Sequence, residues 1–215
     1  MSTVKIKTSW DEVTLEEYMK ISEIELDEEL KINPISKSLK FISILSDKNE
    51  NEIFEMDQVM FSELLEKISF IMISEPVKRD GIFKINGVDY MFHPDFDKLT
   101  TGEIISIQTI CNDAVKEDRS FLPEILSMLI RPCSKRFDEE RKEDIFEIEK
   151  FKLENLEHRR KLFLKELKVP YFVKHLDAFM DGANRSKIIS NLSSVRKNHL
   201  EGQIKELKGI IEKNH

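Results

Sequence analysis

The sequence predicts a mainly α-helical fold: a helical body with one small β-hairpin at about 82–92 and a long C-terminal helical extension. Three observations lead to this fold class. Apolar residues recur at the three- and four-residue spacing of a buried helix face through most of the chain. A single Asn-Gly pair marks one tight turn. The 215 residues also include only 6 Gly and 6 Pro, too few for the many turns of a β-sandwich or barrel.

The first predicted helix covers about 15–24. Thr14 and Glu17 have the spacing of a capping box, in which each side chain satisfies a backbone N–H group of the other residue. Trp10 lies just before this start and is predicted to pack back on the helix. Further upstream, residues 3–8 alternate between apolar and polar side chains, which predicts a short strand.

Two more helices are predicted before Pro76. Pro34 lies in the first turn of one of them, which runs through about Leu45 and has a wide apolar face. Asp57 is the predicted N-cap of the other, which reaches about Ile73 and carries apolar residues at helical spacing. The proline then ends this part of the chain.

The hairpin is the clearest β signal in the chain. Asn86-Gly87 separates two short runs, 82–85 and 88–92, that are rich in apolar and β-prone residues. An Asn-Gly pair is typical of a type I′ turn, because both central residues of that turn need a positive φ angle. The sequence therefore predicts two antiparallel strands at this point.

Two helices are predicted after the hairpin. Thr100 and Glu103 repeat the capping-box pattern and open a helix over about 101–114. This helix carries isoleucines at three-residue spacing on one side. The second helix is predicted over about 120–130, and Arg131 with the proline that follows it ends the helix.

The most charged segment, 138–168, is predicted as a single long helix. Acidic residues gather at its start and lysines and arginines at its end, an order that complements the helix dipole. Its apolar residues are spaced by threes, fours and their sums. A short apolar helix over about 171–180 is predicted next, and it closes at Asp181-Gly182.

The last part of the chain, 186–214, is predicted as a terminal helix with a partner-facing seam. The seam has the 4-3-4 spacing of a packed helix and consists of Leu200, Ile204, Leu207 and Ile211. Two glycines weaken this helix, so we expect it to need a partner surface. The chain is accordingly divided into a helical body with the hairpin, 1–182, and a C-terminal interaction tail, 183–215.

Composition argues against several functional classes. A formal net charge of −7 does not suit a general nucleic-acid binder, which needs a basic face. No apolar run approaches the roughly 18 residues of a membrane span. Cys111 and Cys133 lack metal-binding spacing and are predicted to be reduced thiols of an intracellular protein, with a disulfide as the minor alternative.

Residue chemistry predicts a protein that is not an enzyme. The chain has no Gly-rich phosphate loop, and no nucleophile lies in a Gly-flanked elbow. The segment from His93 to Asp97 comes nearest to a metal-ligand cluster, but its proline and the lack of a second histidine favour a turn. We therefore predict no catalytic, metal-binding or cofactor-binding residues, and no cofactor.

Three segments carry a pattern of caps, turns and core residues. The first is WDEVTLEEYMKI (10–21), and the second joins FKINGVDYMF (83–92) to DFDKLTTGEIISIQ (95–108). The third is LSMLIRPCSKRFDEE (126–140), with a later apolar VPYFVKHLDAFMDG (169–182). Together they resemble the tail-assembly-chaperone-like or virion structural proteins of tailed bacteriophages, especially phages of gut Bacteroidetes that include the crAss-like group.

The resemblance implies a shared fold and a role in building the virion, which is assembled in the host cytoplasm, without any catalytic position. The segment 138–168 is longer than the family pattern needs, and the tail 185–215 lies outside it. Both extensions suit a protein retained in the particle as a tail, ring, connector or packaged cargo component. The implied partners are other phage structural proteins and further copies of the chain, with no membrane.

Two other functions are compatible with the sequence. One is a soluble tail assembly chaperone that leaves before the virion matures. The other is a nucleic-acid-associated regulator that uses the basic C-terminal tail. Leucine and isoleucine occupy the regular positions of that tail, which favours a protein partner over nucleic acid.

Overall fold

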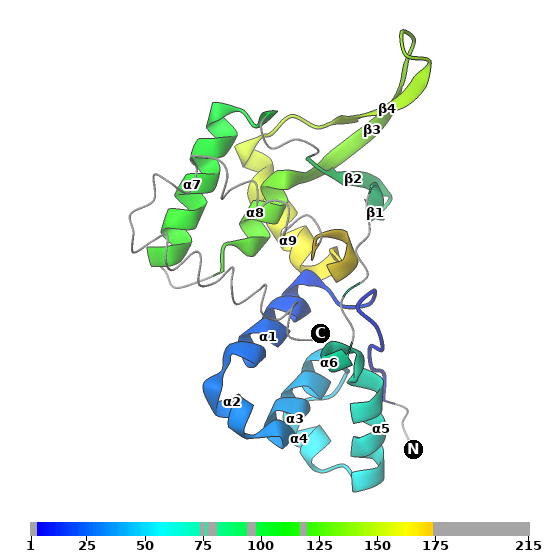
Figure 1. The fold of residues 1–215 in the computed structure, drawn as a ribbon, viewed down its shortest axis with the longest axis vertical. Coiled ribbons are helices and arrows are strands. Elements are labelled where there is room, and N and C mark those ends of the chain that lie inside the picture. Colours follow the sequence, from blue (N-terminus) through cyan, green and yellow to red (C-terminus); the bar gives the residue numbers. More distant parts are fainter. Residues whose placement is uncertain (1–3, 74–75, 77–80, 94–97, 117–119, 174–215) are drawn as a thin grey trace. The chain divides into compact units, whose positions relative to one another are not determined.

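A computed structural model describes residues 4–73, 76, 81–93, 98–116 and 120–173 of the chain (Figure 1). The predicted mainly α fold class is wrong, because the chain is mixed α/β. Its helices accompany a four-stranded antiparallel sheet with the strand order β1-β2-β3-β4. The sequence predicted only the first two of these strands.

The described residues fall into two compact units, which we treat separately. Unit 1 contains the described part of 1–77 together with Lys168–Pro170. Unit 2 contains the described part of 78–167 together with 171–173. All four strands of the sheet belong to unit 2.

Unit 1 is built from short helices. They are α1 (Leu15–Leu26), α2 (Glu28–Ile32), α3 (Pro34–Leu45), α4 (Glu50–Phe54), α5 (Gln58–Ile68) and α6 (Phe70–Ile73). The predicted starts are confirmed, since Pro34 is the first residue of α3 and Asp57 caps α5. The predicted third helix is interrupted at Ser69, so its segment forms both α5 and α6.

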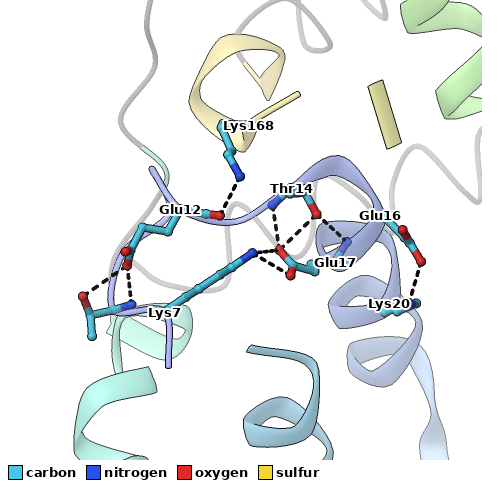
Figure 2. Close-up of polar contacts among 8 residues, drawn as sticks. Lys7, Glu12, Thr14, Glu16, Glu17, Lys20 and Lys168 are labelled. Carbon is cyan, nitrogen blue, oxygen red and sulfur yellow. Dashed lines mark hydrogen bonds and ion pairs between the residues drawn. The ribbon is translucent and has the colours of Figure 1, made fainter. Parts of the chain in front are cut away.

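The first helix begins at the predicted capping box. Thr14 N donates to Glu17 Oε2 at 2.9 Å, and Glu17 N donates to Thr14 Oγ1 at 3.3 Å (Figure 2). The ammonium group of Lys7 pairs with the same carboxylate. Trp10 packs edge-on against Tyr18 of α1 with 6.2 Å between the ring centroids, which confirms its predicted position.

Two extended segments complete unit 1. Ile6 forms one β-bridge to Ser46, the residue that follows α3, so the predicted strand at 3–8 is reduced to a single bridge in its described part. Lys168 forms another bridge with Thr14, and its Nζ donates to the backbone oxygen of Glu12 at 3.1 Å (Figure 2). The chain thus returns to the start of α1 after more than a hundred intervening residues.

In its described residues, unit 2 combines the sheet with three α-helices. Its elements are β1 (Phe83–Ile85), β2 (Val88–Phe92), α7 (Thr101–Lys116), α8 (Leu122–Leu129), β3 (Ile130–Asp138), β4 (Glu143–Ile148), the 3₁₀ turn η2 (Leu153–Asn155) and α9 (Leu156–Glu166). Helix α8 packs against both α7 and α9 and continues directly into β3. The helices predicted over 101–114 and 120–130 are confirmed as α7 and α8.

The predicted hairpin is confirmed as β1 and β2. Asn86 and Gly87 have φ angles of 50° and 81°, both positive as a type I′ turn requires. Phe83 lies opposite Tyr90 across the ladder, and their rings stack with 6.2 Å between centroids. Strand β3 then adds to the other side of β2 in antiparallel register.

The single helix predicted over 138–168 is wrong. Its first part forms a turn and β4, and α9 accounts only for Leu156–Glu166. Strand β4 pairs along its whole length with β3, and cross-strand ion pairs such as Lys135–Asp144 give its charged residues partners. This pairing joins the segment after residue 138 to residues 133–137, which lie between two predicted helices, so the local spacing of apolar residues could not reveal it.

The proposed domain boundary at residue 182 lies outside the described residues. The same is true of the tail 183–215 and of the predicted helix 171–180 beyond residue 173. The division into a body and a tail therefore stays a prediction.

Replacing Gly87 by alanine should destabilise the protein by about 1 kcal/mol or more, because an L side chain is strained at its positive φ angle. Gly102→Ala is the matched control: Gly102 lies in the first turn of α7, and its nearest neighbour to an added Cβ is 4.0 Å away. That control should be neutral or slightly stabilising. Urea unfolding of both variants measures the difference, and equal effects would contradict the assigned turn.

Candidate interaction surface on the β3–β4 hairpin

The hairpin of β3 and β4 extends away from the helices of unit 2 (Figure 1). The first residues of β3 pair with β2, up to Pro132 opposite Tyr90. From Cys133 onward, the strand pairs with β4 alone among the described residues. The outer part of the hairpin is therefore a two-stranded ribbon, and such ribbons are marginally stable by themselves in water.

The turn of this hairpin lacks the usual glycine or proline signals. Asp138 Oδ1 accepts hydrogen bonds from the backbone N atoms of Glu140 and Arg141 at 3.0 and 3.2 Å. Lys142 closes the turn with a φ angle of 52°. A lysine is not typical of that left-handed conformation, which is why the sequence did not predict a turn here.

One face of the ribbon exposes two aromatic rings. We call it the aromatic face and define it by four side chains: Lys135, Phe137, Asp144 and Phe146. The register places Lys135 opposite Phe146 and Phe137 opposite Asp144, and opposed residues of an antiparallel pair share a face. Phe137 is 57% exposed and Phe146 is 40% exposed. The two rings are diagonal to each other in this register. Lys135 and Asp144 are diagonal too, and Lys135 Nζ lies 2.6 Å from Asp144 Oδ2.

The opposite face of the ribbon is more polar. It carries Arg136 opposite Ile145 and Asp138 opposite Glu143. Arg136 also approaches Glu147, with 3.9 Å between Nη1 and Oε2. The two faces thus differ in kind, since exposed aromatic rings occur on one of them only.

A buried ion pair lies at the root of the hairpin. Arg131, in β3, is only 3% exposed, and its Nη2 lies 2.8 Å from Oε1 of Glu103 in α7, whose side chain is 5% exposed. The other carboxylate oxygen accepts from Thr100 N and Thr100 Oγ1, both at 2.7 Å. Glu103 therefore has two roles, because it completes the predicted capping box and also balances a buried arginine.

A second buried arginine extends this cluster to α9. Arg159 Nη1 donates to the backbone oxygen of Ser127 at 2.9 Å. Its Nη2 lies 3.6 Å from Oε1 of Glu149, the residue that follows β4. Arg131 Nη1 donates to the backbone oxygen of that glutamate at 3.2 Å. The Arg131–Glu103 pair contacts β3, and the Arg159–Glu149 pair contacts the residue that follows β4. The cluster therefore holds both strands at the base of the hairpin, next to the helices.

The ionisation of Glu103 reflects this setting. Burial alone would raise the pKa of its carboxyl group, but hydrogen bonds from Thr100 and the charges of Arg131 and His93 outweigh it and hold the pKa below its ordinary value. Burial also lowers the pKa of the Arg131 and Arg159 guanidinium groups below their usual range. The neighbouring carboxylates act in the opposite direction and raise it in part. The pair is therefore ionised at neutral pH.

Chemistry elsewhere in the described residues is sparse. No group of histidine, cysteine and carboxylate residues there could hold a metal ion. Cys111 and Cys133 are free thiols, and burial raises the pKa of Cys111 to about 12, which makes it a poor nucleophile at neutral pH. Within the described parts of the chain, no helix is long and apolar enough to cross a membrane.

The residues predicted to contact a partner are not among those described. Leu200, Ile204, Leu207 and Ile211 all lie in 174–215, so the partner-facing seam stays a prediction. Sequence reasoning also missed the aromatic face and the buried cluster. One signal was available: Arg131 follows a long apolar run, where a charged residue needs a buried partner.

Comparisons with known proteins add no relative. No protein-family model matches the chain, and no match was found among curated proteins or solved structures.

Removing the arginine of the buried pair should be strongly destabilising. Arg131→Met leaves Glu103 buried and uncompensated, and breaking such a pair costs about 3 to 5 kcal/mol. The double variant Glu103→Met/Arg131→Met should recover most of that loss, because no unpaired charge is left. Glu157→Gln, at an exposed ion pair of α9, is the control and should leave the unfolding free energy unchanged. A double variant no more stable than Arg131→Met alone would contradict the coupling.

The lowered pKa of Glu103 also predicts a pH dependence. An unfolded glutamate has a pKa of about 4.3, so ionised Glu103 contributes its full stabilisation above that pH. The contribution is lost as the pH falls through the lower pKa of the folded state. The stability difference between the native protein and Glu103→Gln should therefore shrink on acidification below about pH 4. Urea unfolding at a series of pH values measures it, and a constant difference would refute the assigned ionisation.

Proposed function

We propose that this chain is a non-enzymatic virion morphogenesis or structural protein of a tailed bacteriophage, acting through protein–protein assembly. The observation that carries the binding role is the aromatic face of the β3–β4 hairpin. Phe137 and Phe146 are exposed together on a ribbon whose base is held by the buried Arg131–Glu103 ion pair. Aromatic residues on a held, projecting element are typical of protein-interaction sites.

Charge supports a protein partner over nucleic acid. The aromatic face has one cation and one anion, which pair with each other. A surface that binds a phosphate backbone needs an excess of lysine and arginine, and β4 has no basic residue at all. The hairpin surface therefore suits a protein partner, and the regulator that binds nucleic acid through its basic tail stays an alternative that only the sequence of the tail bears on.

The virion context is supported by the similarity of the sequence to phage tail-assembly-chaperone-like proteins. On this proposal the partners are other phage structural proteins and further copies of the chain, which together form a tail, ring, connector or packaged cargo component in the host cytoplasm. A soluble chaperone that leaves before maturation is the second candidate. It shares the same interaction surface and differs only in whether the protein stays in the particle.

The aromatic face can be tested directly in phage assembly. In a phage that encodes the protein, we expect Phe137→Ser/Phe146→Ser to lower its incorporation into particles at least about tenfold, since both anchors are removed. The matched control is Phe54→Ser, which removes an 80% exposed phenylalanine of α4 in unit 1 and should incorporate normally.

Quantitative mass spectrometry of purified virions measures incorporation in both variants. Abundant native protein in the particles supports the structural role and removes the chaperone. A native protein that is made in infected cells but is absent from particles would contradict retention. Normal incorporation of the double variant would remove the hairpin as the binding element.

A further inference from the structure

The aromatic face has the arrangement of a surface that binds its own copy. Its four side chains form a two-by-two array, with the two rings on one diagonal and Lys135 and Asp144 on the other. The array is electrically neutral but carries one charge of each sign. Phe137 and Phe146 are both exposed at the two corners between these charges.

We propose that this face pairs with the same face of a second copy of the chain, across a two-fold axis parallel to the Phe137–Phe146 diagonal. This rests on the proposed function and deepens it by naming one partner. Rotation about that diagonal places Phe137 over Phe137 of the second copy and Phe146 over Phe146 of the second copy. The same rotation exchanges the corners of the other diagonal, so Lys135 of each copy faces Asp144 of the other.

Other ways of stacking two such faces are less favourable. An axis along the Lys135–Asp144 diagonal would bring like charges together, which is costly at an interface. An axis parallel or perpendicular to the strands would place each ring against a charged side chain of the second copy. Only the aromatic diagonal gives ring on ring and opposite charges together.

The geometry of a β-ribbon allows this approach. With a strand spacing of about 4.8 Å and a two-residue repeat of about 6.8 Å, the aromatic diagonal lies about 35° from the strand direction. The two-fold rotation doubles this angle, so the strands of the two hairpins cross at roughly 70°. That angle is near the orthogonal class of sheet packing. The contact involves few residues, well short of the roughly 1,200 Å² that a stable interface buries. It should thus be weak between two free chains and strengthened where many copies are held together.

The β4 edge of the hairpin does not offer a comparable contact. Strand β4 is the last strand of the sheet, and three of its six residues are acidic: Glu143, Asp144 and Glu147. Antiparallel pairing of two β4 strands about their centre would place Asp144 opposite Glu147 of the second copy. Like charges directly opposite each other destabilise a strand pair, so the face is a better contact between copies than the β4 edge.

Charge exchange tests the pairing in the full-length protein. Lys135→Glu gives a face with two acidic side chains, and Asp144→Lys gives one with two basic side chains. Each variant alone should self-associate at least about tenfold more weakly than the native chain, because each faces its own like charges. An equimolar mixture should associate again, because every acidic side chain then faces a basic one.

Sedimentation velocity at high protein concentration measures the association, and native mass spectrometry identifies the mixed dimer. Arg136→Glu and Glu147→Lys make the same charge changes on the opposite face and should leave self-association unchanged. Circular dichroism of all four variants verifies that the hairpin is folded. A native chain that stays monomeric, or a mixture that associates no better than the single variants, overturns the inference.

The outcomes of this test distinguish a failure of the pairing from a failure of the proposed function. If Phe137→Ser/Phe146→Ser blocks incorporation but charge exchange does not restore association, the face binds a different virion protein and only the inference falls. If the mixture restores association but purified virions lack the protein, the pairing stands and the structural role in the particle falls.

Discussion

The buried pair of Arg131 and Glu103 is the interaction on which the architecture of unit 2 depends. It joins the start of β3 to the first turn of α7, while Arg159 and Glu149 join the end of β4 to α9. Charges this deeply buried are tolerated only when each has a partner. We infer that the cluster favours this arrangement of strand and helix over others, and the outer hairpin extends from it.

How much of this could be predicted depends on the range of the interactions. The capping boxes at Thr14 and Thr100 and the Asn86-Gly87 turn involve neighbours in the sequence, so they were predicted correctly. The pairing of β3 with β4 was missed. Its turn closes through Asp138 and the positive φ angle of Lys142, and residue types there give no distinctive signal.

The candidate site could not be predicted from the sequence either, because it depends on the pairing of β3 with β4. Lys135, Phe137, Asp144 and Phe146 form a face only once the register of the two strands is known. A sequence interpreted as one helix over 138–168 distributes the same side chains differently. Glu103 illustrates a subtler limit: its local role as a capping residue was predicted, but its ion pair with Arg131, 28 residues away in sequence, was not.

The central claim is that the buried pair holds the hairpin in place so that its aromatic face is presented outward. Hydrogen–deuterium exchange of the full-length protein tests this most directly, by comparing the native chain with Glu103→Gln. We expect faster exchange along both Ile130–Asp138 and Glu143–Ile148 in the variant, with little change in α1 and α3 of unit 1. Unchanged exchange in the hairpin, with faster exchange confined to α7, would contradict the claim.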